Sequence, residues 1–341
     1  MKLVSFARRD EKLPLDRPYS LWAGTEKEKV QVGILVGDSR VLSVNSSWSS
    51  LQTQEQAPQE MLQLIQKNET LLPLLRQLEQ KALAGQLNSA LIELTDAQLL
   101  SPLPNPTSMR DGYAFRQHVE AARRNRGVPM IPEFDHFPVF YFTNPFAVTG
   151  PGPISVQKLA QQKLDFELEV AIVIGKAGKN IPASQADSHI LGYMIMNDWS
   201  ARELQMEEMK LNLGPAKGKD FATSLGPWLV TREELEKFAI QGTHGERHNL
   251  RMRTWVNGKL LSDGNVKDMT WTFAQIVERA SYGVWLQPGE VIGSGTVGTG
   301  CLLELNGSKI TDHLWLKPGD EVVMEVDQLG RLSNTILDGG A

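Results

Sequence analysis

The segment Leu164–Ile174, with the sequence LDFELEVAIVI, constrains the fold of this chain more than any other. Polar and apolar residues alternate in its first half, and its second half is apolar and β-branched, which predicts a strand. Since every second side chain of a strand points the same way, we expect Glu167 and Glu169 on one face. Two carboxylates this close to a core repel each other, so either one binds a proton or a cation lies between them.

A simpler interpretation is that Glu167 and Glu169 line the solvated face of an edge strand. Acidic residues are depleted in strands, however, and the continuation Val170–Ile174 is apolar enough to be buried on both faces. These two points favour a functional site. The segment alone leaves both interpretations open.

The composition bounds the classes to which the protein can belong. The chain has 341 residues, enough for one large domain or more than one ordinary domain, and its net charge of −5 argues against non-specific binding of nucleic acid. The densest basic run, Arg123–Arg126, is typical of a solvated helix face or loop. The single cysteine, Cys301, allows no disulfide within the chain, which fits a reducing compartment. We find no signal-peptide pattern and no apolar run of membrane-spanning length, and therefore expect a cytoplasmic protein without a membrane partner.

The residue pattern changes twice along the chain. Residues 1–100 begin as short strands, with a hairpin turn at residues 37–40, and continue as leucine-rich helices between residues 57 and 85. Residues 101–108 contain three prolines and are predicted to be a linker. Residues 109–341 are dominated by strand patterns, glycine turns and clustered acids. We therefore expect a mixed, β-rich α+β fold, in which a small α+β N-terminal domain supports a larger catalytic domain.

A further acidic residue follows another predicted strand. The apolar run of residues 190–197 would place Asp198 at its end, and Ser200–Glu203 matches a capping box, which predicts a helix start. Arg202 and Gln205 would share one face of that helix. A carboxylate, a guanidinium and an amide would then converge. An ordinary N-terminal acid and a surface arginine would give the same pattern.

Three more segments contain residues that catalysis could use. Asp111 and His118 follow the predicted linker, and domain junctions often form pockets. Lys219 lies in a glycine-rich loop that lacks the Ser/Thr and the helix of a phosphate-binding loop. Residues Gly293–Gly298 match G-x-G-x-x-G, but we predict Cys301–Leu305 to be a strand and therefore reject a dinucleotide site. A close approach of this backbone to a ligand, or a plain turn, is the remaining interpretation.

Together these segments resemble the fumarylacetoacetate hydrolase family over roughly residues 109–305. The resemblance rests on five motifs: Asp111-Gly112-Tyr113 followed by Arg116-Gln117-His118, Asp165-Phe166-Glu167-Leu168-Glu169, Met196-Asn197-Asp198-Trp199-Ser200-Ala201-Arg202 with Gln205 three residues on, Gly218-Lys219-Asp220-Phe221-Ala222-Thr223, and Gly293-Ser294-Gly295-Thr296 with Leu303-Glu304. The first 100 residues contain no motif that matches.

The resemblance implies a fumarylacetoacetase-type β-sandwich roll, a homodimer, and one Mg²⁺ or Ca²⁺ ion per active site. It implies that the metal ligands are four carboxylates, a set that suits a hard cation: Asp111, Glu167, Glu169 and Asp198. His118 would be the general base, oriented by Glu304. The developing negative charge would be held by Arg202, Gln205 and Lys219, and the substrate would be contacted by Tyr113, Tyr141 and Thr296.

The resemblance also implies a reaction, the hydrolysis of a carbon–carbon bond in a small 1,3-diketo acid. Fumarylacetoacetate, from the breakdown of tyrosine, is the first expectation. An acylpyruvate hydrolase, or a 2-oxo acid decarboxylase, hydratase or isomerase on the same metal site, is the alternative, and a metal-stabilised binding protein without turnover is a third. Which of Arg123, Arg124 and Arg126 contacts a substrate carboxylate is left open.

Overall fold

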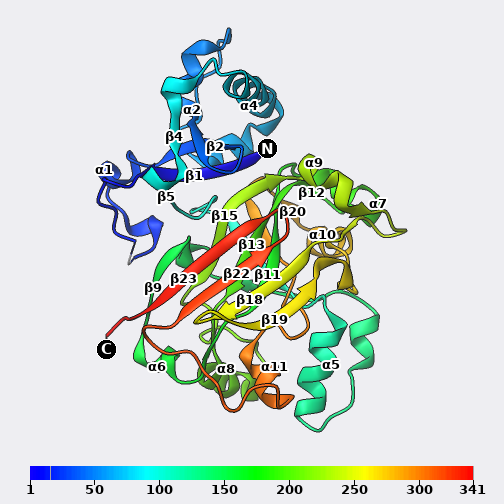
Figure 1. Ribbon diagram of the computed structural model, residues 1–341. Coiled ribbons are helices and arrows are strands. Elements are labelled where there is room, and N and C mark those ends of the chain that lie inside the picture. The colour runs from blue at the N-terminus through cyan, green and yellow to red at the C-terminus, as the bar shows by residue number, and fades with distance from the viewer. Residues whose placement is uncertain (16, 341) are drawn as a thin grey trace.

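The computed structural model describes residues 1–15 and 17–340. Within these ranges the chain forms one large and one small sheet, with helices around them (Figure 1). The large sheet has twelve strands, in the order β4-β3-β2-β1-β15-β13-β11-β21-β6-β7, with β5 and β8 attached to β1 and β15. Its strands are β1 (Lys2–Arg8), β2 (Gln31–Val36), β3 (Arg40–Ser43), β4 (Leu91–Glu93), β5 (Ala97–Leu99), β6 (Ser108–Gly112), β7 (Phe140–Thr143), β8 (Val148–Thr149), β11 (Leu168–Ile174), β13 (Ile190–Asp198), β15 (Thr223–Thr231) and β21 (Glu290–Gly293).

The small sheet has the order β19-β18-β22-β23-β9 and packs against the middle of the large one. Its strands are β9 (Gly152–Val156), β18 (Arg251–Val256), β19 (Lys259–Asn265), β22 (Glu321–Val326) and β23 (Gly330–Asp338). Three two-residue pairs complete the strands: β10 (Leu164–Asp165) with β14 (Ser200–Ala201), β12 (Gly178–Lys179) with β20 (Trp285–Leu286), and β16 (Ala239–Ile240) with β17 (Arg247–His248).

Most helices are short and lie at the periphery. They are α1 (Gly24–Lys27), α2 (Val44–Ser47), α3 (Met61–Gln66), α4 (Asn68–Leu83), α5 (Arg116–Asn125), α6 (Lys158–Gln161), α7 (Ala183–Ala186), α8 (Arg202–Glu208), α9 (Arg232–Leu235), α10 (Phe273–Ser281) and α11 (Leu302–Gly307). Helices α5, α8 and α11 lie together at one end of the molecule (Figure 1). Among the described residues, no helix is both long and apolar enough to cross a bilayer.

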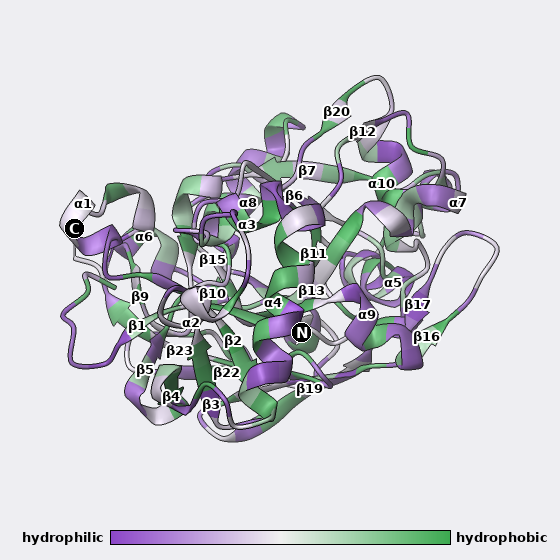
Figure 2. Cartoon of the chain, turned by 90° about the horizontal axis from the view of Figure 1, so that it is seen from above, coloured by the Kyte–Doolittle hydropathy of each residue, from purple (hydrophilic) through white to green (hydrophobic). Residues whose placement is uncertain are grey.

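Strand β11 is the centre of the core because both of its faces are covered. Val170 and Ile172 pack into the apolar cluster that includes the small sheet, whereas Ala171 and Val173 pack into the cluster that includes α3 and α4. This double burial explains the continuous apolar run in its sequence. Figure 2 shows hydrophobic residues along such inner strands and hydrophilic residues on outer helices and loops. The mixed, β-rich α+β fold predicted from the sequence is confirmed.

The N-terminal strands are continuous with the large sheet. β1 pairs with β15, with Lys2 opposite Val230 and Leu3 opposite Leu229. The hairpin predicted around residues 37–40 is present as β2 and β3, which pair antiparallel. Backbone pairing thus joins residues 1–100 to the rest, and the predicted domain division at residues 101–108 stays a prediction.

Three local predictions from the sequence were wrong. The segment Leu164–Ile174 is two strands, β10 and β11, because the chain leaves the ladder at Phe166–Glu167, where the Glu167 N–H donates to Asn197 Oδ1. The capping box at Ser200–Glu203 does not form, since the Ser200 hydroxyl donates to the Asp198 carbonyl and helix α8 begins at Arg202.

The third correction concerns Cys301–Leu305, which is the start of helix α11 instead of a strand. Its first two N–H groups, from Leu302 and Leu303, donate to the Asp165 carboxylate at 2.7 and 2.9 Å, which stabilises a helix N-terminus. Leu302 and Leu305 are buried at helical spacing. The absence of a following helix therefore does not exclude a dinucleotide site at Gly293–Gly298, but the glycines there approach the acidic cluster instead.

Candidate active site

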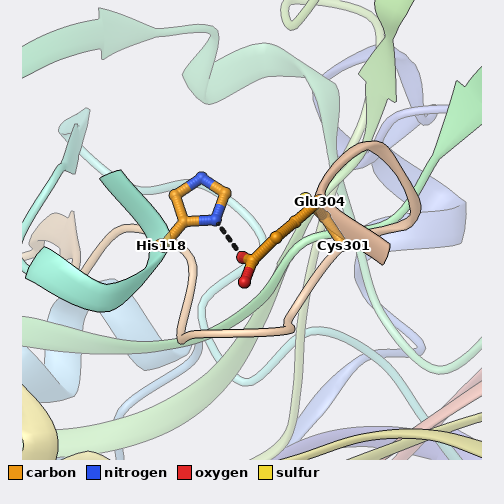
Figure 3. A group of neighbouring side chains, drawn as sticks. All are labelled: His118, Cys301 and Glu304. Carbon is orange, nitrogen blue, oxygen red and sulfur yellow. Dashed lines mark hydrogen bonds and ion pairs between the residues drawn. The ribbon is translucent and has the colours of Figure 1, made fainter. Parts of the chain in front are cut away.

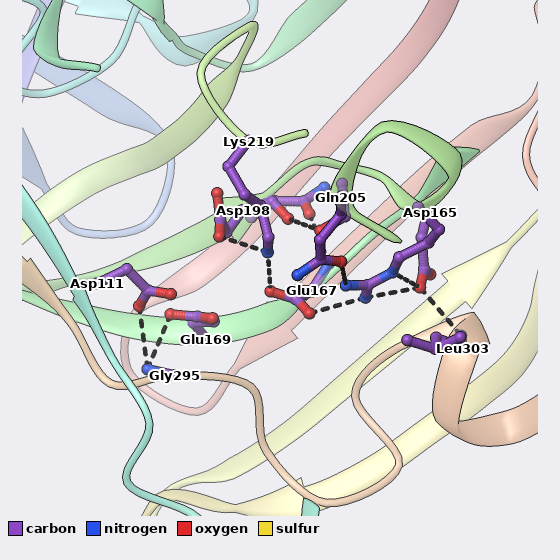
Figure 4. Close-up of polar contacts among 12 residues, drawn as sticks. Asp111, Asp165, Glu167, Glu169, Asp198, Gln205, Lys219, Gly295 and Leu303 are labelled. Atoms are coloured by element: carbon purple, nitrogen blue, oxygen red, sulfur yellow. Dashed lines mark hydrogen bonds and ion pairs between the residues drawn. The ribbon is translucent and has the colours of Figure 1, made fainter. Parts of the chain in front are cut away.

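Four buried carboxylates meet near the ends of β6, β11 and β13. Asp111 comes from β6, Asp198 is the last residue of β13, and Glu169 lies in β11 two residues after Glu167. One oxygen of each lies within 4.8 Å of one oxygen of every other. All four residues are at most 5% exposed. The structure thus brings together the four metal ligands that the family resemblance implied (Figure 4).

Two glycines of the G-x-G-x-x-G segment make this arrangement fit. A Cβ at Gly293 would lie 2.4 Å from Asp111 Oδ1 and 2.9 Å from Glu169 Oε2, so a side chain there would fill the cluster. The Gly295 N–H donates to both carboxylates, at 3.2 and 3.0 Å, and its φ of +78° favours glycine. The motif therefore brings backbone close to acidic side chains.

Two cations lie on one side of the cluster. Lys219 Nζ donates to Glu167 and, at 2.7 Å, to Asp198 Oδ2. Arg202 Nη2 donates to Glu167 Oε1 at 2.7 Å, and its Nε donates to Asp165 Oδ2 at 2.8 Å. Burial would lower the pKa of Lys219, but the charges of Asp198 and Glu167 outweigh it and raise that pKa. The ammonium group therefore keeps its proton.

The charges of the site do not balance. Five buried carboxylates, including Asp165, face the two cations, which leaves three negative charges without a partner if all are ionised. Two like charges 4 Å apart repel by about 4 kcal/mol at an effective dielectric constant of 20. Burial and the charge of Asp198 raise the pKa of Asp111 to about 7, and burial and Asp111 raise the pKa of Glu169 well above its usual value.

The cluster has the properties of a site for a hard divalent cation. The buried atoms Glu169 Oε1 and Asp198 Oδ1 have no hydrogen-bond partner among the described residues, and buried carboxylate oxygens normally have one. A cation bound by these oxygens would satisfy them and compensate the excess charge. The donor set is all oxygen, which suits Mg²⁺, Ca²⁺ or Mn²⁺.

A histidine and a glutamate form a pair beside this cluster. His118 of α5 lies with its Nδ1 2.7 Å from Glu304 Oε2 of α11, and both side chains are buried (Figure 3). Since a carboxylate only accepts, Nδ1 carries the proton and Nε2 of the neutral ring has a free lone pair. The Thr299 N–H holds the other oxygen of Glu304 at 2.9 Å. The pair thus has the orientation that a general base needs.

Glu167 lies between the two groups. Burial would raise its pKa, but Lys219, Arg202 and His118 together lower it below the usual value. Arg202, which donates to Glu167, also donates to Asp165, and Asp165 caps the helix that carries Glu304. The proton-handling pair and the proposed metal ligands therefore face one reaction centre.

Asp165 and Cys301 are two residues of this region whose roles the sequence did not reveal. Asp165 joins α11 to Arg202, since it accepts from both, and so connects Glu304 with the cation side of the cluster. The helix it caps lies 137 residues further along the chain, which no local pattern discloses. Cys301 is fully buried beside Glu304, and burial raises the pKa of its thiol well above the usual value.

A cavity of about 230 Å³ opens next to His118 and Glu304. It is bounded by α5, α8, α11 and the loop after α11, with Arg126, Met206 and His313 on its wall. Of the arginines in the basic run, Arg123 donates through Nε to the carbonyl of Pro129, whereas Arg126 faces the cavity. Burial raises the pKa of the Tyr113 phenol, and the charge of Arg126 opposes that rise.

The other predicted site residues also lie in this region. Gln205 accepts from Arg202 Nη1 at 2.9 Å, and its amide NH₂ donates to no other residue that the structure describes. The Tyr113 ring contacts His118 edge to face, with centroids 5.8 Å apart. Tyr141 donates to Asp198 Oδ2, and so supports a proposed ligand, while Thr296 is buried in the loop after Gly295. Their contacts with a substrate stay a prediction.

Comparison with known proteins supports the family that the motifs indicated. The profile of the fumarylacetoacetate (FAA) hydrolase C-terminal family matches residues 107–337. The oxaloacetate tautomerase YisK of Bacillus subtilis is 29% identical over 314 residues, covering 89% of this chain and 95% of its own. The mitochondrial oxaloacetate tautomerase fahd2 of Xenopus laevis is 31% identical over 253 residues, covering 73% and 72%. The fumarylacetoacetase of Oryza sativa is 30% identical over 290 residues, covering 69% and 66%.

Solved structures share the fold over nearly the whole length. A fumarylacetoacetate hydrolase from Exiguobacterium antarcticum superposes with a TM-score of 0.68 at 22% identity, covering 99% of both chains. The maleylpyruvate hydrolase of Sphingobium, in complex with manganese(II) and pyruvate, gives 0.67 at 21% identity, covering 99% of this chain and 100% of its own. Profile, relatives and fold agree with the motifs, and this chain belongs to the fumarylacetoacetate hydrolase family.

Proposed function

We propose that this protein is a divalent-metal-dependent enzyme that interconverts the keto and enol forms of oxaloacetate. The observation that carries the proposal is the buried His118–Glu304 pair beside four carboxylates, since keto–enol exchange needs a base and a means of holding an enolate. Support also comes from the tautomerase YisK, whose similarity extends over 95% of its own length, whereas the rice fumarylacetoacetase is matched over 66%.

The proposed cation would be held by Asp111, Glu167, Glu169 and Asp198. Bound there, Mg²⁺, Ca²⁺ or Mn²⁺ would supply Lewis-acid polarisation of the 2-oxo group and stabilise the negative charge of the enolate.

His118 is proposed to move the proton. Its Nε2 takes a proton from C3 of oxaloacetate, between the carbonyl and carboxylate groups, while Glu304 holds Nδ1–H and stabilises the imidazolium. Return of that proton to the enolate oxygen gives the enol. A base in this role contributes about 10²–10⁴-fold to the rate.

Lys219 and Arg202 are proposed to act as fixed positive charges. Their neighbouring carboxylates raise the pKa of both, so each stays protonated throughout the reaction. Lys219 is therefore a poor proton donor, and its contribution is electrostatic. The amide NH₂ of Gln205 adds a donor for the developing charge.

The cavity indicates where the far end of the substrate binds. We propose that Arg126 binds the second carboxylate of a dicarboxylic 2-oxo acid there, because it is the arginine of the basic run that lines this cavity. Tyr113, which packs on His118, would lie along the substrate between His118 and Arg126.

Hydrolysis of a 1,3-diketo acid such as fumarylacetoacetate, to fumarate and acetoacetate, is the second candidate. The cavity favours it, since a volume of about 230 Å³ beside His118 leaves room for an acyl chain beyond the 2-oxo acid. In this reaction the same pair would take the proton from water instead of carbon.

One panel of substrates distinguishes the two candidate functions. Enol oxaloacetate, fumarylacetoacetate and an acylpyruvate are each mixed with the Mg²⁺-loaded and the chelated protein, the decay of enol or diketone absorbance is followed, and products are identified by NMR. The proposal expects metal-dependent decay of enol oxaloacetate to the keto form without cleavage. Cleavage of a diketo acid at a far higher kcat/KM than tautomerisation would replace the first candidate by the second.

A further inference from the structure

A second group of potential metal ligands lies at the histidine–glutamate pair. One nitrogen of His118, Sγ of Cys301 and one oxygen of Glu304 all lie within 4.8 Å of one another. The three residues are at most 7% exposed, and Figure 3 shows them together. We propose that these three residues form an inhibitory site for a thiophilic divalent cation of the Zn²⁺ class, separate from the four-carboxylate cluster.

The two groups of ligands differ in the cations that they favour. The carboxylate cluster offers only oxygen, which suits Mg²⁺, Ca²⁺ and Mn²⁺. The second group offers imidazole, thiolate and carboxylate, which are the three donor types of protein zinc sites. An excess of Mg²⁺ therefore occupies the first site and leaves the second to Zn²⁺ or Co²⁺.

The geometry needs only small adjustments to bind such a cation. His118 Nδ1 and Glu304 Oε2 are 2.7 Å apart and share a proton. Zinc bonds to nitrogen and oxygen are about 2.0–2.2 Å long, so a cation in place of that proton requires these atoms to separate by about 1 Å or less. Cys301 directly precedes α11 and Glu304 lies in its first turn, so one short segment supplies two of the three ligands.

The fourth coordination position and the entry path come from the cavity. His118 and Glu304 both line the cavity of about 230 Å³, which is large enough for a hydrated cation to enter and for a water molecule to remain bound. Three protein ligands and one water is the arrangement of accessible zinc sites. Binding releases one proton to solvent, from the Cys301 thiol, while the proton of the neutral His118 ring moves from Nδ1 to Nε2, and it needs no oxidant or reductant.

Binding of a cation at this site would prevent His118 from acting as the base. The cation would fix the orientation and the charge of the His118 imidazole, and it would also bind Glu304. The imidazole could then no longer accept a proton with the help of that carboxylate. The predicted inhibition rests on the role that the proposed function gives to His118, whereas the predicted binding does not.

Cobalt tests the binding directly, because a thiolate bound to Co²⁺ gives a charge-transfer band in the near ultraviolet. The chain has a single cysteine, so such a band can come only from Cys301. Co²⁺ is titrated into the full-length protein in excess Mg²⁺. We expect the band to saturate at one equivalent and to be absent in Cys301→Ser. Absence of the band in the wild-type protein overturns the proposal.

Two further variants define the other ligands. His118→Ala is expected to weaken the Co²⁺ affinity read from the band by about tenfold or more. His313→Ala is the matched control, since His313 lines the same cavity outside the three ligands, and its titration should superpose on that of the wild type. An unchanged affinity in His118→Ala, or loss of the band in His313→Ala, contradicts the assignment. These variants decide the matter even where Cys301→Ser fails to fold, which circular dichroism reports.

Zn²⁺ inhibition in excess Mg²⁺ tests the regulatory consequence. We expect the inhibition constant to rise by about tenfold or more in Cys301→Ser, each variant being referred to its own uninhibited rate. An equal inhibition constant would mean that Zn²⁺ acts at the carboxylate cluster, and would overturn the inhibitory role. Should no substrate turn over at all, the proposed function fails, while the cobalt band still decides whether the site exists.

Discussion

The carboxylate cluster and the His118–Glu304 pair are built on different parts of the fold. Three of the four cluster carboxylates lie on β6, β11 and β13 of the large sheet, and Glu167 directly precedes β11. Backbone from β21 and the following loop fits between their side chains. The pair lies on the short helices α5 and α11 at the end of the molecule, next to a cavity. The carboxylates that are proposed to bind the cation therefore lie mainly on paired strands. The pair that is proposed to move the proton lies on helices beside the cavity.

The largest effect is expected from the cluster. Glu169→Gln removes one proposed ligand, so the affinity for Mn²⁺, measured by electron paramagnetic resonance, should fall by about 100-fold or more, and activity should fall with it. In chelator the same variant should unfold at a higher temperature than the wild type, because it removes an unpaired carboxylate. Glu207→Gln, on the exposed face of α8, is the matched control. Unchanged affinity in Glu169→Gln would remove this residue from the ligand set.

The next largest effect separates the two regions. His118→Ala should lower kcat by about 10²–10⁴-fold, since it removes the proposed base, while the Mn²⁺ affinity of the cluster stays close to that of the wild type. Steady-state kinetics and metal titration of the same preparation measure both. Joint loss of metal and activity would mean that the two regions are not functionally distinct.

A smaller effect is expected from the residue that orients the base. Glu304→Gln keeps the shape but cannot stabilise the imidazolium, so kcat should fall by about 10–100-fold with KM little changed. The pH profile of kcat should change as well, because the carboxylate no longer favours the protonated ring. An unaltered pH profile would indicate that Glu304 serves only to pack α11 on α5.

A substitution at the cavity wall is expected to affect substrate binding. Arg126→Gln should raise KM for a dicarboxylic substrate by about tenfold, through loss of a charge-assisted hydrogen bond, and should leave kcat nearly unchanged. Arg123→Gln is the control, since Arg123 donates to the backbone of Pro129. Equal values of KM in the two variants would argue against a carboxylate site at Arg126.

The smallest effect is a dependence of metal binding on pH. Asp111 has a pKa of about 7, so its proton must leave before it binds a cation, and the Mn²⁺ affinity should rise between pH 6 and pH 8. The sign for stability is opposite: a raised folded-state pKa gives stability below the unfolded pKa that is lost as pH rises through 7. In the presence of a chelator the unfolding temperature should fall as the pH rises toward 7 and level off above it, and added metal should restore most at pH 8. A metal affinity that is flat with pH would contradict the shift.

Individual strands could be predicted from the sequence more reliably than the site at which their acidic residues converge. The apolar run before Asp198 is β13, and the hairpin at residues 37–40 is present, because alternation and turn residues act locally. The convergence of Asp111, Glu169 and Asp198 depends on pairing between strands far apart in the chain, which no periodicity discloses. The family motifs supplied that information instead.

Two of the three failed predictions have a common physical cause. Glu167 leaves the strand because Asn197 takes its N–H, and Cys301–Leu305 is helical because Asp165 accepts two N–H groups of α11. In both places a polar side chain distant in sequence decides the backbone conformation at the site. Local propensity therefore fails where the catalytic groups are positioned.

In the proposed reaction the cluster holds a cation while His118 moves a proton on carbon. The most direct test is the exchange of the C3 hydrogens of oxaloacetate with D₂O, followed by NMR with the Mg²⁺-loaded protein, the chelated protein and Mg²⁺-loaded His118→Ala. We predict fast exchange in the first sample only, with both others near the rate without enzyme. Fast exchange in His118→Ala, or in the chelated protein, would contradict it.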